Sequence, residues 1–387
     1  MKRLFIMFMV ALFSLGVVVP LTEAQENNAE IANVAKSAVL IERDTGAVLY
    51  EKNSHEQLAP ASMTKIMTMI LIMDALDREQ IKWEDTVRTS EYAASMGGSQ
   101  IFLEPGEEMT VKKMLEGIAI GSANDASVAM AEFIAGSEEN FVQKMNEKVA
   151  ELGLKDTQFQ NPTGLPAKEH YSSSHDMAMM AKELLKYPDI TTFTGTYEAY
   201  LRENTDKKFW LVNTNKLVRF YPGVDGLKTG FTNEAKYCLT ATAKKGDMRV
   251  IAVVFGAPTP KDRNAEVTKM LDYAFNQYTT HPLYEKDKEL AHLTISKGAK
   301  KKVSVITSES ISLLTKKGEK LEEIEEKISL SQLKAPIVKG EVVGKLTIKK
   351  DGKVLSESSL VAKENVAEAK WWQLYKRSFG MFSKSSK

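Results

Sequence analysis

A very apolar run, residues 66–76, directly follows a short segment that contains a proline. Residues 63–73 are apolar on nearly all sides of a helix, which is typical of a buried helix rather than a surface helix. Pro60 suits the start of a helix and cannot lie inside one. The pattern therefore predicts a central buried helix that has Ser62 at its N-terminal end.

Short apolar runs on either side of this helix have the pattern of strands. Residues 37–52 form two runs around Asp44-Thr45-Gly46, which indicates a hairpin. Residues 227–230 begin a strand-like region, and residues 236–244 and 248–257 look like two further strands joined by a tight turn. The last of these strands is apolar on both faces, so it should lie inside a sheet that is covered on both sides.

Helical spacing of apolar positions dominates the middle of the chain. The predicted helices cover residues 109–120, 126–135, 141–152, 176–185 and 267–278. Strands at both ends of this region, with helices between them, favour an α+β fold: a mainly antiparallel sheet sandwiched by helices. This is the fold class we expect for residues 25–282.

The composition changes near residue 283, where lysine and glutamate become more frequent. Short alternating runs follow at residues 292–296, 302–306, 310–314, 344–349 and 354–362. Short strands separated by turns predict a small all-β domain. We place this domain at residues 283–364, and we find no candidate chemistry in it.

The first 24 residues have the pattern of an export signal. Lys2 and Arg3 precede an almost unbroken apolar stretch, residues 4–21, and residues 22–24 offer a cleavage site with small residues. The alternative is an uncleaved membrane anchor, because the stretch is just long enough to span a bilayer. Gly16 and Pro20 weaken a continuous helix and favour cleavage. We therefore expect an exported protein that faces the cell wall at the outer side of the cytoplasmic membrane.

Residues 365–387 combine aromatic and basic side chains. Apolar residues recur at steps of three and four: Trp371, Trp372, Leu374, Tyr375, Phe379 and Phe382. As a helix, this segment is too polar to span a bilayer, but its aromatic face suits the headgroup region beside anionic lipids. The prediction is a peripheral membrane anchor; the alternative is a helix packed on the β-rich domain.

Composition and charge exclude some classes of function. The chain has 387 residues, 43% of them hydrophobic, and a net charge of +1, which gives no reason to expect a nucleic-acid partner. Cys238 is the only cysteine and is expected to be a small core residue. The five histidines show no metal-ligand spacing. We expect neither a metal nor a cofactor.

Ser62 and Lys65 form a Ser-x-x-Lys pair at the predicted helix start. Residues three apart share a helix face, so the Lys65 amine would stand beside the Ser62 hydroxyl. A serine hydroxyl needs a base to become a strong nucleophile. A neutral lysine is such a base, and burial, a second cation and the helix dipole would each lower its pKa.

Two further motifs follow in order, Ser122-x-Asn124 in a break between two helices and Lys228-Thr229-Gly230 at the start of a strand. Each motif alone is more simply structural, with Ser122 as a helix cap and Lys228 as a solvated strand end. The ordered set is known from class A β-lactamases and penicillin-binding proteins.

The chain resembles the low-molecular-mass penicillin-binding proteins, serine D-alanyl-D-alanine carboxypeptidases, and is most similar to the sporulation-associated type of Bacillus-like bacteria. The resemblance covers nearly the whole chain and is strongest at residues 58–68, 95–99, 161–165 and 225–230. It implies that the substrates are peptidoglycan stem peptides ending in D-Ala-D-Ala. It also implies that β-lactam antibiotics are covalent inhibitors.

The resemblance also implies a role for each motif residue. Ser62 would be the acylated nucleophile, Lys65 its general base, and Ser122 a proton relay to the leaving amine. Asn124 would bind the peptide amide, opposite a wall formed by Lys228, Thr229 and Gly230. Backbone N–H groups of Ser62 and Phe231 would form the oxyanion hole. Arg263 would hold the terminal carboxylate, to which a guanidinium is well suited.

Two other functions use the same residues. A serine β-lactamase needs a glutamate that activates the deacylating water, and Glu169 is the nearest candidate between Asn124 and Lys228. Its surroundings lack the expected pattern, so we interpret Glu169 as a solvated loop residue. The other alternative is a penicillin-binding sensor without turnover. Every catalytic position is occupied, which favours an enzyme.

Overall fold

The computed structural model describes residues 31–372 and 375, apart from residues 320–323 and 351. The predicted export signal therefore lies outside the described residues. Within the described part of the chain, no helix has both the length and the apolar character needed to cross a membrane. Residues 32–387 cluster as one unit, and the account below concerns that unit.

A five-stranded antiparallel sheet lies at the centre of the first domain, with strand order β2-β1-β9-β8-β7. Its strands are β1 (Ser37–Glu42), β2 (Val48–Lys52), β7 (Val224–Thr232), β8 (Lys236–Lys245) and β9 (Met248–Ala257). The predicted hairpin is confirmed as β1–β2. The prediction for residues 248–257 is also confirmed, because β9 lies between β1 and β8 and is almost entirely buried.

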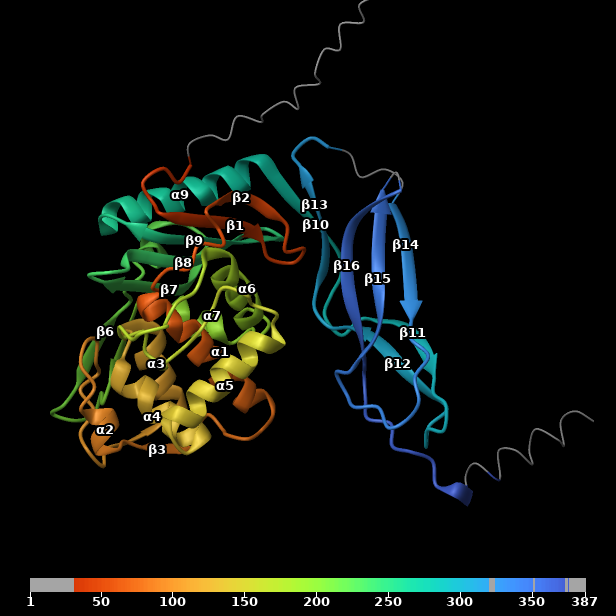
Figure 1. The fold of residues 1–387 in the computed structure, drawn as a ribbon, viewed down its shortest axis with the longest axis horizontal. Helices are drawn as coiled ribbons and strands as arrows, with labels where there is room; N and C mark the ends of the chain where they lie inside the picture. Colours follow the sequence, from red (N-terminus) through yellow and green to blue (C-terminus); the bar gives the residue numbers. More distant parts are fainter. Residues whose placement is uncertain (1–30, 320–323, 351, 373–374, 376–387) are drawn as a thin grey trace, which may run out of the picture. The chain divides into compact units, whose positions relative to one another are not determined.

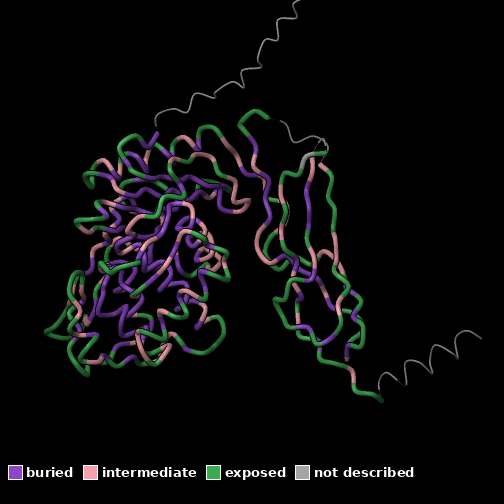
Figure 2. Tube along the Cα trace, in the orientation of Figure 1, coloured by how far each residue is buried: buried purple, intermediate pink, exposed green. Residues whose placement is uncertain are grey.

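Helices cover both faces of this sheet, as predicted (Figure 1). The long helix α9 (Pro260–Gln277) packs against β8 and β9 on one face, and α6 (Ser174–Leu184) packs against β1 and β9 on the other. Next to α6 lies α1 (Lys65–Asp77), of which ten residues are buried. The apolar run identified in the sequence thus lies within the hydrophobic core of the domain (Figure 2).

The remaining helices of this domain are α2 (Glu91–Ala94), α3 (Val111–Gly121), α4 (Asn124–Ala135), α5 (Glu138–Glu151), α7 (Ile190–Thr194) and α8 (Leu217–Phe220). Of these helices, α3, α4 and α5 pack against α1, and α2, α7 and α8 pack on neighbouring elements. Two short hairpins accompany them: β3 (Thr86–Arg88) with β4 (Glu108–Thr110), and β5 (Glu198–Leu201) with β6 (Phe209–Val212). The sequence did not predict these hairpins.

The predicted all-β domain is confirmed and has its own hydrophobic core. Its main antiparallel sheet has the order β11-β12-β16-β15-β14, and β10 pairs with β13. The strands are β10 (Tyr278–Tyr284), β11 (Glu289–Thr294), β12 (Lys302–Thr307), β13 (Ile311–Lys316), β14 (Ile324–Leu330), β15 (Val342–Lys350) and β16 (Lys353–Ala362). Because β10 pairs with β13, the strand pairing of this domain begins at Tyr278, a few residues before the predicted boundary.

The segment after β16 differs from the prediction of a helix from residue 365 onward. Val366 is buried and pairs with Ile337, and the Ala369 N–H donates to the Lys297 carbonyl. The chain therefore remains part of the β-rich domain up to residue 369, because an apolar side chain at position 366 completes its core. Trp371 and Trp372 are helical and exposed, and residues 376–387 lie outside the described residues.

Candidate active site

Ser62 lies in a single 3-10 turn, Ala61–Thr64, that leads directly into α1. Pro60 precedes this turn, as the sequence predicted, although the first turn is tighter than an α-helix. The side chain of Lys65 is fully buried one turn later. Its Nζ atom lies 3.1 Å from Ser62 Oγ, so the predicted pair does form on one face.

The Lys65 amine has three partners. Besides Ser62 Oγ, it donates to Asn124 Oδ1 at 2.6 Å and to the Thr163 carbonyl at 2.7 Å. Neither of these two oxygens carries a proton. A neutral amine that donates its two protons to them therefore turns its lone pair toward the Ser62 hydroxyl. This geometry allows Lys65 to accept the Ser62 proton.

The surroundings of Lys65 favour this neutral form. Burial holds the pKa of Lys65 well below its usual range, and the positive charge of Lys228 lowers it further. Asp125 acts in the opposite direction. Burial and a second cation were both expected from the sequence. The third expected cause, the N-terminal end of the helix, is present geometrically because Lys65 is the first residue of α1.

The second motif lies where α3 ends and α4 begins. Ser122 has a left-handed backbone, with φ of 63°, and its side chain is almost completely buried. Asn124 begins α4, its N–H donates to the Ser99 carbonyl at 2.7 Å, and its Nδ2 donates to the Gly97 carbonyl at 2.7 Å. These two bonds leave Oδ1 of Asn124 directed at Lys65.

The third motif lies on β7, which passes close to the turn of Ser62. A Cβ atom on Gly230 would come within 2.8 Å of the Pro60 carbonyl oxygen, so only glycine permits this approach. Lys228 is 1% exposed; burial and the nearby charge of Arg263 lower its pKa to about 7. Thr229 Oγ1 donates to Thr214 Oγ1 at 2.7 Å, a partner that the sequence did not suggest.

Phe231 and Arg263 lie at the edge of this group. The Phe231 side chain is half exposed and packs on Tyr237, with ring centroids 4.4 Å apart. Arg263 lies in the first turns of α9, where its Nε and a terminal nitrogen donate to Asn264 Oδ1 at 3.1 and 2.9 Å. Arg263 is buried and influences Lys228 through its charge.

Residues 161–165 carry part of the family resemblance, but the sequence assigned no role in the site to the loop of residues 161–170, which lies against the turn of Ser62. Thr163 supplies the carbonyl that binds Lys65, and the Pro162 carbonyl accepts from Thr68 Oγ1 at 2.7 Å. His170 Nε2 lies 2.8 Å from Thr64 Oγ1, and burial lowers its pKa to about 4. A backbone carbonyl has no signature in a sequence, so the part played by Thr163 could not be predicted.

Glu169 does not join the site. Its side chain is exposed, and its backbone carbonyl accepts from Gln160 Nε2 at 3.3 Å. The interpretation of Glu169 as a solvated loop residue therefore agrees with the structure. Cys238 is buried in β8, as expected.

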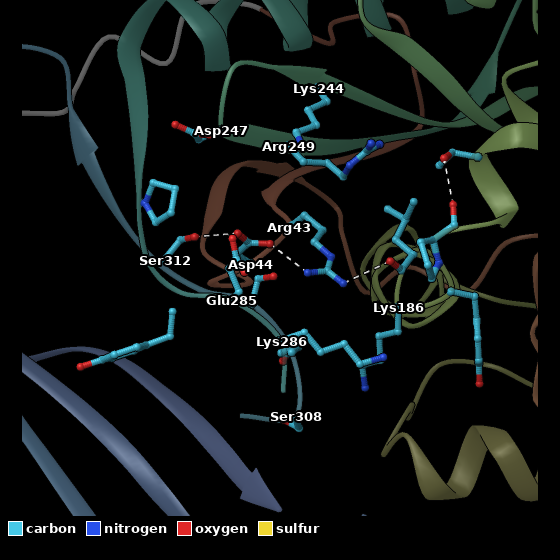
Figure 3. Close-up of a pocket in the computed structure, with 18 residues that line it drawn as sticks. Arg43, Asp44, Lys186, Lys244, Asp247, Arg249, Glu285, Lys286, Ser308 and Ser312 are labelled. Carbon is cyan, nitrogen blue, oxygen red and sulfur yellow. Dashed lines mark hydrogen bonds and ion pairs between the residues drawn. The ribbon is translucent and has the colours of Figure 1, made fainter. Parts of the chain in front are cut away.

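A polar pocket elsewhere contains none of the predicted site residues (Figure 3). Asp44 lies at its centre, where it accepts from Arg43 at 2.9 Å and from Ser312 Oγ at 2.7 Å. Arg43, Asp44 and Ser312 thus bond to one another, and the residues that line the pocket include no Ser-x-x-Lys pair. Within the described residues, no group of three histidine, cysteine, aspartate or glutamate side chains is arranged to hold a metal ion.

Comparison with protein families gives two matches. Residues 22–259 match the family model described as D-alanyl-D-alanine carboxypeptidase, peptidase S11. Residues 278–368 match the C-terminal domain of penicillin-binding protein 5. The second match ends at residue 368, next to Ala369, whose N–H donates to the Lys297 carbonyl of the β-rich domain.

Individual relatives agree with these families. The chain is 66% identical to the D-alanyl-D-alanine carboxypeptidase DacF of Bacillus subtilis, over 93% of this chain and 92% of that protein. It is 35% identical to the D-alanyl-D-alanine carboxypeptidase DacA of Escherichia coli strain K12, over 87% of this chain and 85% of the relative.

Among solved structures, penicillin-binding protein 5 of Haemophilus influenzae matches this chain with a TM-score of 0.68 at 33% sequence identity. The match covers 87% of this chain and 98% of the chain of that structure. Penicillin-binding protein D2 of Listeria monocytogenes, in its ampicillin-bound form, has a TM-score of 0.54 at 29% identity; the match covers 62% of this chain and 98% of that one.

Proposed function

The chain belongs to the peptidase S11 family of D-alanyl-D-alanine carboxypeptidases, which are serine hydrolases and low-molecular-mass penicillin-binding proteins, and we propose that it uses Ser62 to remove the terminal D-alanine from peptidoglycan stem peptides. The observation that carries this proposal is the position of the Lys65 amine, 3.1 Å from Ser62 Oγ and held by two further oxygens.

Acylation begins when Lys65 Nζ accepts the Ser62 proton and Ser62 Oγ bonds to the carbonyl carbon of the penultimate D-alanine. The negative charge that develops on the carbonyl oxygen is stabilised by the backbone N–H groups of Ser62 and Phe231. The peptide C–N bond then breaks, and Ser122 passes a proton to the amine of the leaving D-alanine. Water hydrolyses the resulting ester, which releases the shortened peptide and restores Ser62.

The remaining site residues bind the substrate in this proposal. Asn124 Oδ1 accepts from the amine of Lys65 and its Nδ2 donates to the Gly97 carbonyl, and the substrate amide would bind beside this side chain. Lys228, Thr229 and Gly230 form the opposite wall on β7. Arg263 and Lys228 are two buried cations whose carboxylate partner would be the C-terminus of the substrate.

β-Lactam antibiotics would acylate Ser62 by the same step. A β-lactamase would then hydrolyse the acyl-enzyme quickly, using a carboxylate that activates water as a general base. The Glu169 side chain is exposed in its loop and is not placed as that base, so we propose slow hydrolysis and persistent labelling. Limiting the number of donor peptides for cross-linking would be the consequence of the carboxypeptidase reaction.

The test compares wild-type protein with Ser62→Ala, and uses Ser95→Ala as a control because Ser95 is exposed and its hydroxyl donates to the Tyr92 carbonyl at 2.8 Å. We expect penicillin labelling on the peptide that contains Ser62, and release of D-alanine from an acyl-D-Ala-D-Ala peptide, in the wild type and the control. Both should vanish in Ser62→Ala. Labelling that persists in this variant would refute the proposal, whereas labelling without any D-alanine release by the wild type would favour a sensor.

We further propose that the protein is exported and held at the outer face of the cytoplasmic membrane by its C-terminus. Support comes from three aromatic residues, Trp371, Trp372 and Tyr375, which are 72%, 55% and 44% exposed. Their rings lie 5.5 to 6.1 Å apart, so they form one aromatic cluster. An exposed tryptophan cluster followed by basic residues suits a membrane interface.

Truncation after Lys370 tests this anchor, because it keeps Val366 and the strand pairing of the β-rich domain. The mature full-length protein should sediment with anionic vesicles and be partly released by high salt. The truncated protein should stay in solution with full carboxypeptidase activity. Sedimentation of the truncated protein would refute the anchor, and its unfolding would favour a helix packed on the domain.

A further inference from the structure

The peptide group that joins Thr163 to Gly164 is held at both of its ends. Its carbonyl accepts from Lys65 Nζ at 2.7 Å, and its N–H, on Gly164, donates to Asn161 Oδ1 at 2.7 Å. The N–H and C=O of a trans peptide point in opposite directions within one rigid plane. The bond to Asn161 therefore fixes the direction in which the Thr163 carbonyl points.

Asn161 also binds the residues on both sides of this peptide group. Its Oδ1 accepts from Thr163 N at 3.1 Å and from Thr163 Oγ1 at 2.8 Å, and its Nδ2 donates to the Leu165 carbonyl at 3.0 Å. Thr163 is therefore fixed on both sides by one side-chain amide. The Asn161 side chain itself makes no contact with Ser62 or Lys65 in the hydrogen bonds of the described residues.

We propose that Asn161 is a positioning residue for the general base: it fixes the Thr163 carbonyl, and that carbonyl orients the Lys65 amine so that its lone pair faces Ser62. This inference rests on the proposed function, in which Lys65 accepts the Ser62 proton. It adds a residue that acts on Lys65 through a backbone carbonyl.

The same chain of bonds affects the protonation of Lys65. An acceptor behind a peptide N–H polarises the group and strengthens its carbonyl as an acceptor. A stronger carbonyl favours the ammonium form of Lys65, and a weaker one favours the neutral amine. The other charged groups that act on Lys65 are Lys228 on β7 and Asp125 on α4, and changes at Asn161 leave both in place.

Two substitutions of Asn161 should therefore move the pH profile of acylation in opposite directions. Asn161→Ala removes the acceptor, so the midpoint of the acid limb should fall by about half a pH unit or more. The maximal acylation rate constant should fall about two- to tenfold, because a hydrogen bond that orients the base is lost. Asn161→Asp keeps the acceptor and adds a negative charge, so its midpoint should rise above that of the wild type.

Asn146→Ala is the matched control. Asn146 Oδ1 accepts from Phe159 N at 2.9 Å, and its Nδ2 donates to the Phe159 carbonyl at 2.9 Å, just before the same loop. This variant loses a loop-anchoring asparagine of the same kind, but it leaves the bonds of Thr163 intact. It should unfold at a lower urea concentration and keep the wild-type midpoint.

The experiment measures the acylation rate constant with a fluorescent penicillin, from about pH 5 to pH 10, together with urea unfolding. Opposite shifts in the two Asn161 variants, with none in Asn146→Ala, would support the proposal. An unchanged midpoint in both Asn161 variants, or an equal shift in Asn146→Ala, would overturn it. If Asn161→Ala does not fold, the midpoint of Asn161→Asp alone tests the proposal: a midpoint above that of the wild type would support it, and an unchanged or lower midpoint would overturn it. Absence of Ser62 acylation in the wild type would instead refute the proposed function.

Discussion

Gly164→Ala is the substitution for which the structure makes the sharpest prediction. Gly164 has φ of 81°, in the left-handed region, and a Cβ atom there would overlap the Ala61 carbonyl and lie 2.9 Å from the Ser62 nitrogen. A left-handed alanine costs about 1–2 kcal/mol. The overlap with a backbone group, which cannot rotate away, adds about 1–3 kcal/mol more.

Gly153→Ala separates these two effects. Gly153 also has a left-handed backbone, with φ of 68°, but nothing lies within 4 Å of the position that a Cβ atom would take there. Gly153→Ala should therefore lower the free energy of unfolding by about 1 kcal/mol and leave acylation unchanged. In Gly164→Ala the backbone of Ser62 has to shift, which displaces an N–H group of the proposed oxyanion hole. Loss of one such donor typically costs about a hundredfold or more in rate.

The assay follows acylation by a fluorescent penicillin and urea unfolding for both variants. Gly164→Ala should be the less stable variant by about 1–3 kcal/mol, and its acylation rate constant should be lower by about two orders of magnitude. A folded Gly164→Ala protein that acylates at nearly the wild-type rate would show that the loop does not constrain the Ser62 turn. Equal stability of the two variants would show that the overlap relaxes without cost.

Three other changes test separate parts of the structure. Lys65→Arg keeps the positive charge but removes the base, because arginine stays protonated; acylation detected by mass spectrometry should disappear, and near-normal acylation would place the base elsewhere. Burial lowers the pKa of His170 from 6.5 to about 4. The free energy of unfolding should therefore be constant above pH 6.5 in respect of this group, and should fall by about 3 kcal/mol as the pH falls from 6.5 toward 4. His170→Gln should flatten the pH dependence of urea unfolding in this window, and equal slopes for both proteins would contradict the assignment. Arg263→Ala should reduce turnover of acyl-D-Ala-D-Ala about tenfold more than turnover of an ester without the terminal carboxylate; equal losses on both substrates would remove Arg263 from the site.

The sequence was most informative where burial is complete. The helix α1 and the strand β9 are apolar on nearly all sides, so their hydrophobic pattern alone identified them. The start of α9 was missed because its first residues are polar. One of them, Glu266, is buried against partners far along the chain: it accepts from Val34 N at 2.6 Å and from Ala35 N at 3.1 Å. The strand β14 was missed because it lies at a sheet edge and carries charged, exposed side chains.

In the candidate site, too, the sequence revealed some of the groups and not others. Side chains with a motif were found by residue type, and the structure places Lys65 within hydrogen-bond distance of Ser62 and of Asn124. The Thr163 carbonyl could not be found in this way, since every residue has a carbonyl and this one lies 98 positions from Lys65. The role of Asn161 follows from the direction of a peptide plane, which only a three-dimensional arrangement defines.

The row of buried basic side chains formed by Lys65, Lys228 and Arg263 affects the energetics of binding. The charge of Lys228 lowers the pKa of Lys65, and burial together with the charge of Arg263 lowers the pKa of Lys228 to about 7. An anionic group that enters the site between them would raise this pKa. Binding of a substrate carboxylate near neutral pH should therefore take up protons from solution. In calorimetry, the apparent binding enthalpy should change with the ionisation enthalpy of the buffer, and a neutral ester of the same peptide should show a smaller dependence.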